Sequence, residues 1–466
     1  MPLSVHALRR VAAARAGCIL PFALGGAIGL TAMSASAFEK TAAAGAVSSP
    51  SAMPADAEPA ALRALPVSYT ACSAQPNGTT VIGDAGFGDA VTECTLQAPT
   101  AGYVVAIASA SLALVDTAYE VNAQLMVDDT QGSMADRWVN IYPNAGDGTD
   151  KTIALSHYFP VTAGARRISF KARRYSGGNV MIFDPTLTAI FVPASAAQTV
   201  CGSATGTPFR TQSSAPTSAA SCQVTVAEDS IAFAFASASM GYSLGPTEAR
   251  VWIGLDGTWT SPNDRWVDVY ADDQDGTDES VATHFAFAAT PGTHTFDLFA
   301  SRYSGSGEVT LYDPVLTVIA VPTSAAAICS QQSGLTYTNP AGTPATMSEC
   351  TLSTTTPAHA LVFASASIGR SDPPGGAPYE GLFRLATGGE SLSNTERWID
   401  VDNDGGDGTD RTLATQWGSE LDPGTYAFSL QGSRYSGSGE VRAYNAAIHV
   451  LLLPSDRLFH SDFELP

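Results

Sequence analysis

The chain has 466 residues and a formal net charge of −21. Nucleic-acid-binding proteins present basic faces, and anionic lipid surfaces attract basic segments, so this charge disfavours both as partners. Charged residues make up only 14% of the chain while Gly, Ala, Ser and Thr are plentiful, which is more typical of a secreted β-protein than of a helical cytosolic one.

Residues 1–37 predict a secretory signal peptide. Three arginines precede an apolar stretch from Cys18 to Leu30, and Ala35-Ser36-Ala37 is a small-residue cleavage site. The apolar stretch is too short for a membrane helix. The protein is therefore predicted to be secreted or displayed on the cell surface, with the periplasm as an alternative. After signal removal it is predicted to have no membrane span.

Residues 38–65 are rich in Ala, Ser and Pro and have no apolar period, so they predict a disordered low-complexity leader. Three repeats follow. Their period of about 128 residues is too long for a solenoid unit and long enough for a domain with its own core. The predicted domains are residues 66–193, 194–322 and 323–454, followed by a C-terminal tail, residues 455–466.

Two signatures define the repeats. The first is an Arg-Trp pair that leads into Asp-Gly-Thr-Asp, and the second is Arg-Tyr-Ser-Gly, always at the same distance beyond the first. Their residues are Arg137, Trp138, Arg174 and Tyr175 in repeat 1, Arg265, Trp266, Arg302 and Tyr303 in repeat 2, and Arg397, Trp398, Arg434 and Tyr435 in repeat 3.

The local pattern predicts β-structure throughout. Apolar and polar residues alternate around each signature, and Asp-Gly and Gly-Ser-Gly clusters separate the alternating stretches. No helical period appears after residue 37. About seven or eight short strands per repeat predict a two-sheet sandwich. The fold class is therefore all-β, with three tandem antiparallel β-sandwich domains.

The end of each repeat supports a finer expectation. Gly292-Thr293-His294-Thr295-Phe296 enters a strand, and Asp313-Pro314 precedes a final apolar strand. This portion, about a third of each repeat, resembles the last strands of tumour-necrosis-factor-like jelly-roll domains. The resemblance implies a jelly-roll-like topology, and an immunoglobulin-like sandwich is the alternative.

Six cysteines follow the signal peptide, one pair at the start of each repeat. They are Cys72 and Cys94, Cys201 and Cys222, and Cys329 and Cys350. Because an exported chain reaches an oxidising compartment, three disulfides within the repeats are predicted. A zinc site would need clustered Cys or His residues, and the sequence has no such cluster.

The histidines argue against a catalytic group that the repeats share. Aligning the repeats places Ser156, His284 and Gln416 at one position, and no His recurs at a matched place. A serine triad would need a base beside its nucleophile in every repeat. The chain is therefore predicted not to be an enzyme.

Carboxylates do recur beside the first signature, in numbers that suit calcium. Ca²⁺ takes six to eight oxygen ligands from loops that gather carboxylates, and the alternative is a polar turn built on Asp-Gly. The candidate metal ligands are Asp147 and Asp150 in repeat 1, Asp272, Asp275 and Asp278 in repeat 2, and Asp404, Asp407 and Asp410 in repeat 3.

The recurring Arg and Trp residues have two interpretations each. The arginines are structural, bonded to carboxylates of the Asp-Gly-Thr-Asp loop, or they form an anion site. The tryptophans pack beneath a loop or an Arg, or they are exposed for glycan stacking. The structural interpretation is favoured for both residue types.

The leading hypothesis is an exported, non-enzymatic protein for adhesion, glycan binding or surface structure. Its partner would be an extracellular or cell-surface ligand, with a glycan as the first candidate, and calcium the only expected cofactor. Three similar repeats suit multivalent binding. The alternative is a secreted hydrolase that uses carboxylates as acid and base, about 5–9 Å apart, or its accessory binding module.

Overall fold

The computed structural model describes residues 69–454 with short gaps. The predicted signal peptide, leader and tail lie outside the described residues. The gaps are residues 77, 84, 115–116, 134–135, 142–149, 260–262, 270–278, 334–335, 339–342, 370–378 and 402–410.

The regular secondary structure of the described residues consists of strands apart from one short 3-10 helix, η1 (Ala194–Thr199), which confirms the all-β prediction. Repeat 1 comprises β1 (Thr70–Ala74), β2 (Thr79–Ile82), β3 (Thr92–Ala98), β4 (Gly102–Ala113), β5 (Tyr119–Val127), β6 (Gln131–Gly132), β7 (Arg137–Ile141), β8 (Asp150–Val161), β9 (Gly164–Gly177) and β10 (Val180–Pro193). Repeat 2 comprises β11 (Val200–Ala204), β12 (Phe209–Thr211), β13 (Thr217–Val226), β14 (Ser230–Gly241), β15 (Thr247–Leu255), β16 (Thr258–Trp259), β17 (Arg265–Val269), β18 (Glu279–Ala289), β19 (Gly292–Gly305) and β20 (Val309–Pro322). Repeat 3 comprises β21 (Ala327–Gln332), β22 (Thr336–Thr338), β23 (Ala345–Thr354), β24 (Ala358–Gly369), β25 (Tyr379–Thr387), β26 (Glu390–Ser391), β27 (Arg397–Val401), β28 (Arg411–Leu421), β29 (Gly424–Gly437) and β30 (Val441–Pro454).

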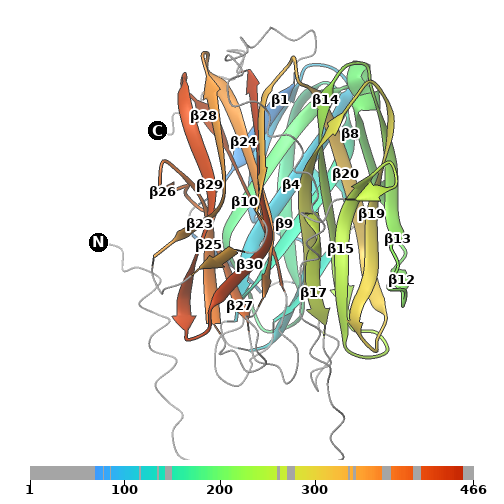
Figure 1. Ribbon diagram of the computed structural model, residues 1–466, viewed down its shortest axis with the longest axis vertical. Coiled ribbons are helices and arrows are strands. Elements are labelled where there is room, and N and C mark those ends of the chain that lie inside the picture. Colours follow the sequence, from blue (N-terminus) through green and yellow to red (C-terminus); the bar gives the residue numbers. More distant parts are fainter. Residues whose placement is uncertain are drawn as a thin grey trace, which may run out of the picture. The chain divides into compact units, whose positions relative to one another are not determined.

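Each repeat forms two antiparallel sheets of five strands (Figure 1). In repeat 1 the inner sheet has the order β1-β10-β4-β8, with β2 also paired to β10, and the outer sheet has the order β3-β9-β5-β6, with β7 also paired to β5. Repeats 2 and 3 reproduce this order strand for strand. The sheets of each pair enclose a separate apolar cluster, so each repeat is an antiparallel β-sandwich, as predicted.

Three disulfides are present, and each joins the two sheets of one sandwich. They are Cys72–Cys94, Cys201–Cys222 and Cys329–Cys350, so the predicted pairing is confirmed. A cross-link over a loop of this size restricts the unfolded chain and stabilises by about 3 kcal/mol.

The inner sheets are apolar on both faces. In β4, Val104 and Ala106 face the core of repeat 1, while Val105 and Ile107 belong to a fourth cluster, to which all three repeats contribute. A strand buried on both faces reads as a continuous apolar run, which explains the long Ala-rich stretches of the sequence. Residues 69–454 accordingly belong to one compact unit, and the division into three domains stays a prediction.

Strands β8, β18 and β28 run side by side along a common axis. Ala154, Ala282 and Ala414, at equivalent positions of the three repeats, pack together in a small buried cluster. Near the first residues of the same strands, the Thr152 hydroxyl donates to the Thr412 carbonyl (2.8 Å). Since equivalent positions meet at two levels, the three strands point in the same direction and the repeats are related by an approximate threefold rotation.

Among the residues described, no helix has the length and apolarity that a membrane span requires.

Two buried histidines lie where repeat 2 meets repeat 3. His284 is 3% exposed, and its ring packs edge-on against Phe235 and Phe363. The Nε2 of His449 donates to the His284 carbonyl (3.4 Å), and its Nδ1 accepts from the Ser330 hydroxyl (2.8 Å). Burial lowers the pKa of His284 to about 3 and that of His449 to about 4, because a charged imidazole would lose its hydration.

These pKa values predict that acid destabilises the protein. As the pH falls below about 6.5, the unfolded chain binds a proton at His284 that the folded chain rejects until about pH 3. In that window each such group reduces the free energy of unfolding by up to about 1.4 kcal/mol per pH unit. His284→Gln introduces the residue that repeat 3 has at this position. Its melting temperature should therefore decrease less between pH 7 and pH 5 than that of the unaltered protein.

His294→Gln is a control, because the contribution of His294 to stability has the opposite pH dependence. The Thr290 carbonyl and then Asp256 raise the pKa of His294, so its contribution is present in acid and is lost as the pH rises. An undiminished acid loss in His284→Gln would show that this histidine does not titrate as a buried group.

Candidate binding site

The side chain of the arginine in the first signature contacts the next repeat. Arg137 is the first residue of β7 and is 1% exposed. Its Nη2 donates to the carbonyl and the hydroxyl of Ser237 (2.7 and 2.8 Å), and its Nη1 donates to the Asp313 carbonyl (2.9 Å). Both acceptors belong to repeat 2, so this side chain joins repeat 1 to repeat 2.

The other two arginines repeat this contact in cyclic order. Arg265 donates to the Ser365 hydroxyl (2.6 Å) and the Asn445 carbonyl (3.2 Å), both in repeat 3. Arg397 of repeat 3 donates to the Ser109 hydroxyl (2.8 Å) of repeat 1, which is 288 residues away in the sequence. The three contacts therefore close a ring of repeats, and we call them the arginine clamps.

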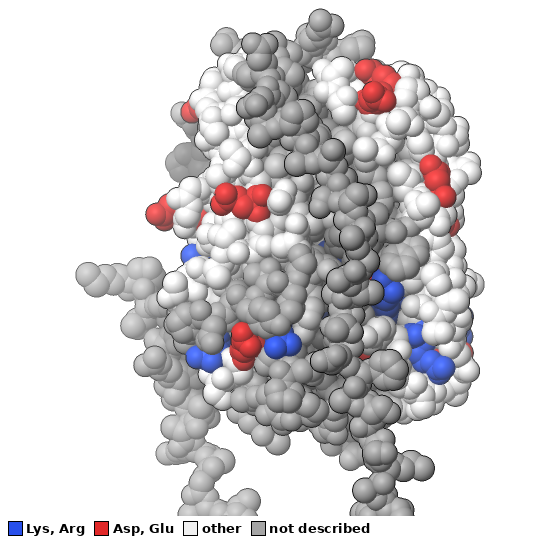
Figure 2. All heavy atoms as spheres, viewed as in Figure 1, with Lys and Arg blue, Asp and Glu red and all other residues white. Residues whose placement is uncertain are grey.

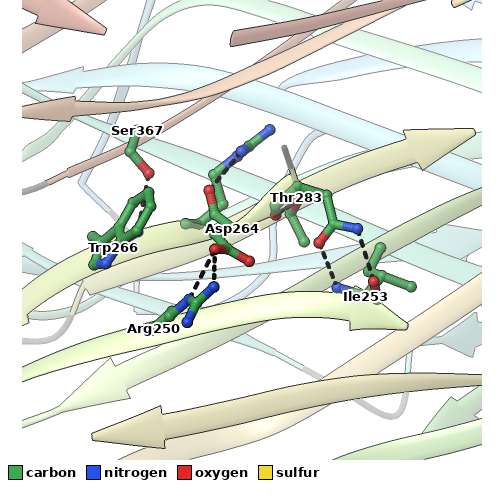
Figure 3. Close-up of polar contacts among 8 residues, drawn as sticks. Arg250, Ile253, Asp264, Trp266, Thr283 and Ser367 are labelled. Carbon is green, nitrogen blue, oxygen red and sulfur yellow. Dashed lines mark hydrogen bonds and ion pairs between the residues drawn. The ribbon is translucent and has the colours of Figure 1, made fainter. Parts of the chain in front are cut away.

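The tryptophan that follows each arginine completes the clamp with its backbone. The Trp266 N–H donates to the Ser367 hydroxyl (2.9 Å) (Figure 3). Trp138 and Trp398 make the same bond with Ser239 and Ser111 (2.7 and 3.1 Å). The Ala-Ser-Ala-Ser stretches of β4, β14 and β24 thus supply one serine to the arginine and one to the backbone of the next residue.

The carbonyl acceptors of the clamps sit at a common backbone distortion. Asp184, Asp313 and Asn445 have φ values of 47°, 47° and 51°, beside the register shifts where β10, β20 and β30 pair with their neighbours. Asp and Asn tolerate this left-handed region better than other side chains. The bulge turns a carbonyl out of its sheet and toward the arginine.

The arginines are buried and hydrogen-bonded. Their described acceptors are hydroxyls and carbonyls of the next repeat and the carbonyl of the preceding residue. The expected bonds to the Asp-Gly-Thr-Asp loop stay a prediction, because residues 142–149, 270–278 and 402–410 lie outside the described residues. Burial lowers the pKa of Arg137, Arg265 and Arg397 to about 10, 9 and 10, so all three stay charged at neutral pH. With at most 1% exposure, they offer no open site to an anion.

The tyrosines of the second signature are exposed. Tyr175, Tyr303 and Tyr435 are 58%, 48% and 44% exposed. Each is the extra residue of a β-bulge: in repeat 1, Glu120 pairs with Ser176 and Val121 with Arg174, which leaves Tyr175 without a partner residue. Repeats 2 and 3 have the same register shift. A bulge redirects a side chain, so the backbone presents these three rings to solvent.

The tryptophans lie beneath this surface. Trp138 meets Tyr175 edge-on at 4.6 Å between ring centroids, and Trp398 meets Tyr435 at 4.5 Å. Trp398 is only 6% exposed. In repeat 2 the guanidinium of Arg250 lies 6.0 Å from the Trp266 ring. The packing interpretation therefore fits the buried Trp398 and the half-buried Trp138 and Trp266. Among the described residues, the exposed large aromatic side chains are the three tyrosines.

Polar groups hold the bulges in place. Ser304 donates to Glu248 (2.8 Å) and Ser176 to Glu120 (3.3 Å), so a carboxylate lies beside the tyrosine. Arg302 is half-buried and donates to the Gly307 carbonyl of its own repeat (3.1 Å). Arg434 donates to the Ser438 and Gly439 carbonyls, and Arg174 is half-buried at the equivalent position.

The three tyrosines lie at one end of the molecule's β-sheets. In repeat 1, Asp150 at the start of β8 pairs with Ala113 at the end of β4, and Ala113 pairs with Met181 near the start of β10. Strand β10 follows β9, and Tyr175 lies near the end of β9. Tyr175 therefore lies at the end where β8 begins. Because β8, β18 and β28 point in the same direction, Tyr303 and Tyr435 lie at that end too.

Three carboxylates meet at the same end, between repeats 1 and 3. Oxygens of Asp150, Glu380 and Asp400 lie within 4.8 Å of one another, and the Asp150 N–H donates to Asp400 (2.8 Å). Of the predicted metal ligands only Asp150 is described, since Asp147, Asp272, Asp275, Asp278, Asp404, Asp407 and Asp410 lie in the gaps. Sequence reasoning missed Glu380 and Asp400, although Glu recurs before each bulge and Asp268 matches Asp400.

Charged groups are sparse on the face that Figure 2 shows, and ion pairs occupy the open pocket of repeat 1. Figure 2 shows one face, on which most of the described surface is uncharged. An open pocket in repeat 1 is lined by both signs of charge. There Lys171 binds Asp129 (3.0 Å), and Arg167 binds Asp129 and Glu93. These acids are neutralised by bases, unlike the free carboxylate pair of a glycoside hydrolase.

Comparison with known proteins identifies no family. No protein-family description matches the sequence, and no curated protein matches it. A solved structure of PNGF-II is similar at 8% identity over 77% of this chain and 99% of its own, with a TM-score of 0.26. The N-terminal tandem CBM22 domain of Paenibacillus barcinonensis Xyn10C is similar at 10% identity over 54% of this chain and 93% of its own, with a TM-score of 0.16. Similarities this low support no inference about fold or function.

Proposed function

We propose that the protein is an exported, non-enzymatic binding protein that attaches to a glycan through three tyrosine sites. The observation behind the proposal is the bulge that exposes Tyr175, Tyr303 and Tyr435 at one end of the sheets, with the half-buried Glu120 and Glu380 opposite it in repeats 1 and 3. A flat aromatic face stacks on the apolar face of a sugar ring, while a carboxylate accepts its hydroxyl hydrogens. Such a site can serve adhesion or surface attachment.

The arrangement suits multivalent binding. A single exposed tyrosine is a weak site, but three linked sites gain avidity when the ligand spans them. The net charge of −21 repels acidic polymers, so the proposed ligand is a neutral or cationic glycan. The three disulfides support an oxidising compartment and hence secretion or surface display.

We infer further that the repeats are three jelly-roll-like domains. With β1 and β2 counted as strand A, and β6 and β7 as strand E, the sheets of repeat 1 have the order A-H-C-F and B-G-D-E. This arrangement corresponds to an eight-stranded jelly roll. It differs from the ABED and CFG sheets of an immunoglobulin domain.

The glycan proposal predicts a stepwise loss of binding. On a glycan array, Tyr175→Ser should weaken binding to the preferred glycan, and the triple variant with Tyr303→Ser and Tyr435→Ser should abolish it. Val81→Ser, which changes another exposed apolar residue (56%) outside the bulges, should bind as the unaltered protein does. The proposal fails if no glycan is bound, or if the triple variant binds as well as the control.

Calcium is proposed as the cation among the three carboxylates. Carboxylate oxygens gathered within 4.8 Å of one another are ligands of the kind that Ca²⁺ prefers. A ligand that binds only the folded state at 100 times its Kd stabilises by about 2.7 kcal/mol. The melting temperature should therefore be higher in excess calcium than in chelator, and Asp400→Asn should reduce that difference.

Asp422→Asn removes an exposed carboxylate from another part of repeat 3 and should leave the calcium-dependent difference unchanged. Equal melting temperatures in calcium and chelator would contradict the site.

A further inference from the structure

One position on the common axis has a different charged residue in each repeat, basic in two repeats and acidic in one. Lys151, Glu279 and Arg411 occupy equivalent places near the starts of β8, β18 and β28. Their side chains are only 4%, 5% and 11% exposed. Lys151 Nζ lies 2.6 Å from Glu279 Oε1, and Arg411 Nη1 lies 3.3 Å from the same oxygen. We call these residues the axial triad.

The triad is favourable because its one acid lies between two bases. Buried charges lose their hydration, and that loss is offset only when opposite charges meet with good geometry. One Glu279 oxygen contacts both cations, and Arg411 also donates to the Asp268 carbonyl of repeat 2 (3.4 Å). A third base in place of Glu279 would leave three buried cations in mutual contact.

The arginine clamps have the same chemistry in all three repeats, so they do not distinguish one repeat from another. Every clamp places an arginine on a serine and a bulge carbonyl of the next repeat. A ring that used one repeat twice, or that borrowed a repeat from a second copy of the chain, would satisfy the clamps equally well. The axial triad discriminates against rings that contain repeat 2 twice or not at all, because only repeat 2 supplies an acid.

We propose that the axial triad selects the composition of the ring. It admits one acidic repeat together with two basic ones, so a ring contains repeat 2 once. The short joints at residues 194–199 and 323–326 then favour closure with the other two repeats of the same chain. This role is independent of the glycan proposal. It concerns which surfaces of the chain recognise one another.

A second position on the axis also differs between repeats. The equivalent residues are Ser156, His284 and Gln416. Gln416 accepts a hydrogen bond from Ser109 (2.7 Å) and donates to the carbonyls of Ile107 and Thr186 (3.1 and 3.0 Å). These bonds lie between repeats 3 and 1, the pair that no peptide joint connects. The inward strands thus differ in neutral side chains as well as in charge.

A charge relocation in the full-length chain tests the proposal. Glu279→Lys makes all three axial residues cationic. We expect a lower melting temperature, because every ring of this variant would bury three cations. We also expect the mass in solution to shift from one chain to multiples of a chain, because repeats that do not close leave the shared apolar faces of the inner sheets exposed. The double variant Lys151→Glu/Glu279→Lys moves the acid to repeat 1 and restores one acid with two bases. It should recover the single-chain mass and most of the melting temperature.

Glu390→Lys makes the same charge change at an exposed residue of repeat 3 and should behave as the unaltered protein. A Glu279→Lys protein with unaltered melting temperature and mass would overturn the proposal, and so would a double variant as impaired as the single one. If Glu279→Lys yields no soluble protein, the double variant decides alone. Its recovery supports selection by charge, and its failure overturns it.

Discussion

A buried guanidinium that crosses from one repeat to the next is the interaction on which the rest of the structure depends. Arg397 is fully buried, and its described acceptors are a serine, a threonine and a backbone carbonyl of repeat 1, besides the carbonyl before it. Arginine suits this role because its planar group offers five donors and keeps its charge. Removing the neighbouring repeat would take away these acceptors and expose the apolar residues that the inner sheets share, which is costly. The repeats are therefore parts of one assembly as well as separate sandwiches.

The same constraint accounts for features that look unrelated in the sequence. The serines of the Ala-Ser-Ala-Ser stretches receive the clamp, and the small alanines let β4, β14 and β24 remain apolar on both faces. The left-handed Asp184, Asp313 and Asn445 aim their carbonyls at the arginines. With the inner sheets facing one another, the outer sheets and the strand ends are left for ligands. The exposed tyrosines occur at such an end.

The sequence predicted local structure well because local structure follows from pattern and repetition. Alternating residues indicated strands, and the recurrence of one cysteine pair per repeat indicated the disulfides. The sequence also favoured a structural role for Arg137 and Trp138. It could not supply the partner of Arg137, because Ser237 lies in another repeat and the contact depends on how whole sandwiches assemble. Nor could it show that Tyr175 is exposed, since a bulge adds one residue and breaks the alternation on which such a prediction rests.

The central claim is that the three repeats close into a ring within one chain, and the alanines on the axis test it most directly. Ala154, Ala282 and Ala414 pack together although their repeats are successive in sequence. Cysteine pairs at 154/282, 282/414 and 154/414 would be oxidised in three variants, and the bonds mapped by non-reducing peptide analysis. The ring predicts a bond within one chain for all three pairs, including 154/414. Bonds for the two successive pairs, with none within the chain for 154/414, would show a linear string of domains and contradict the account.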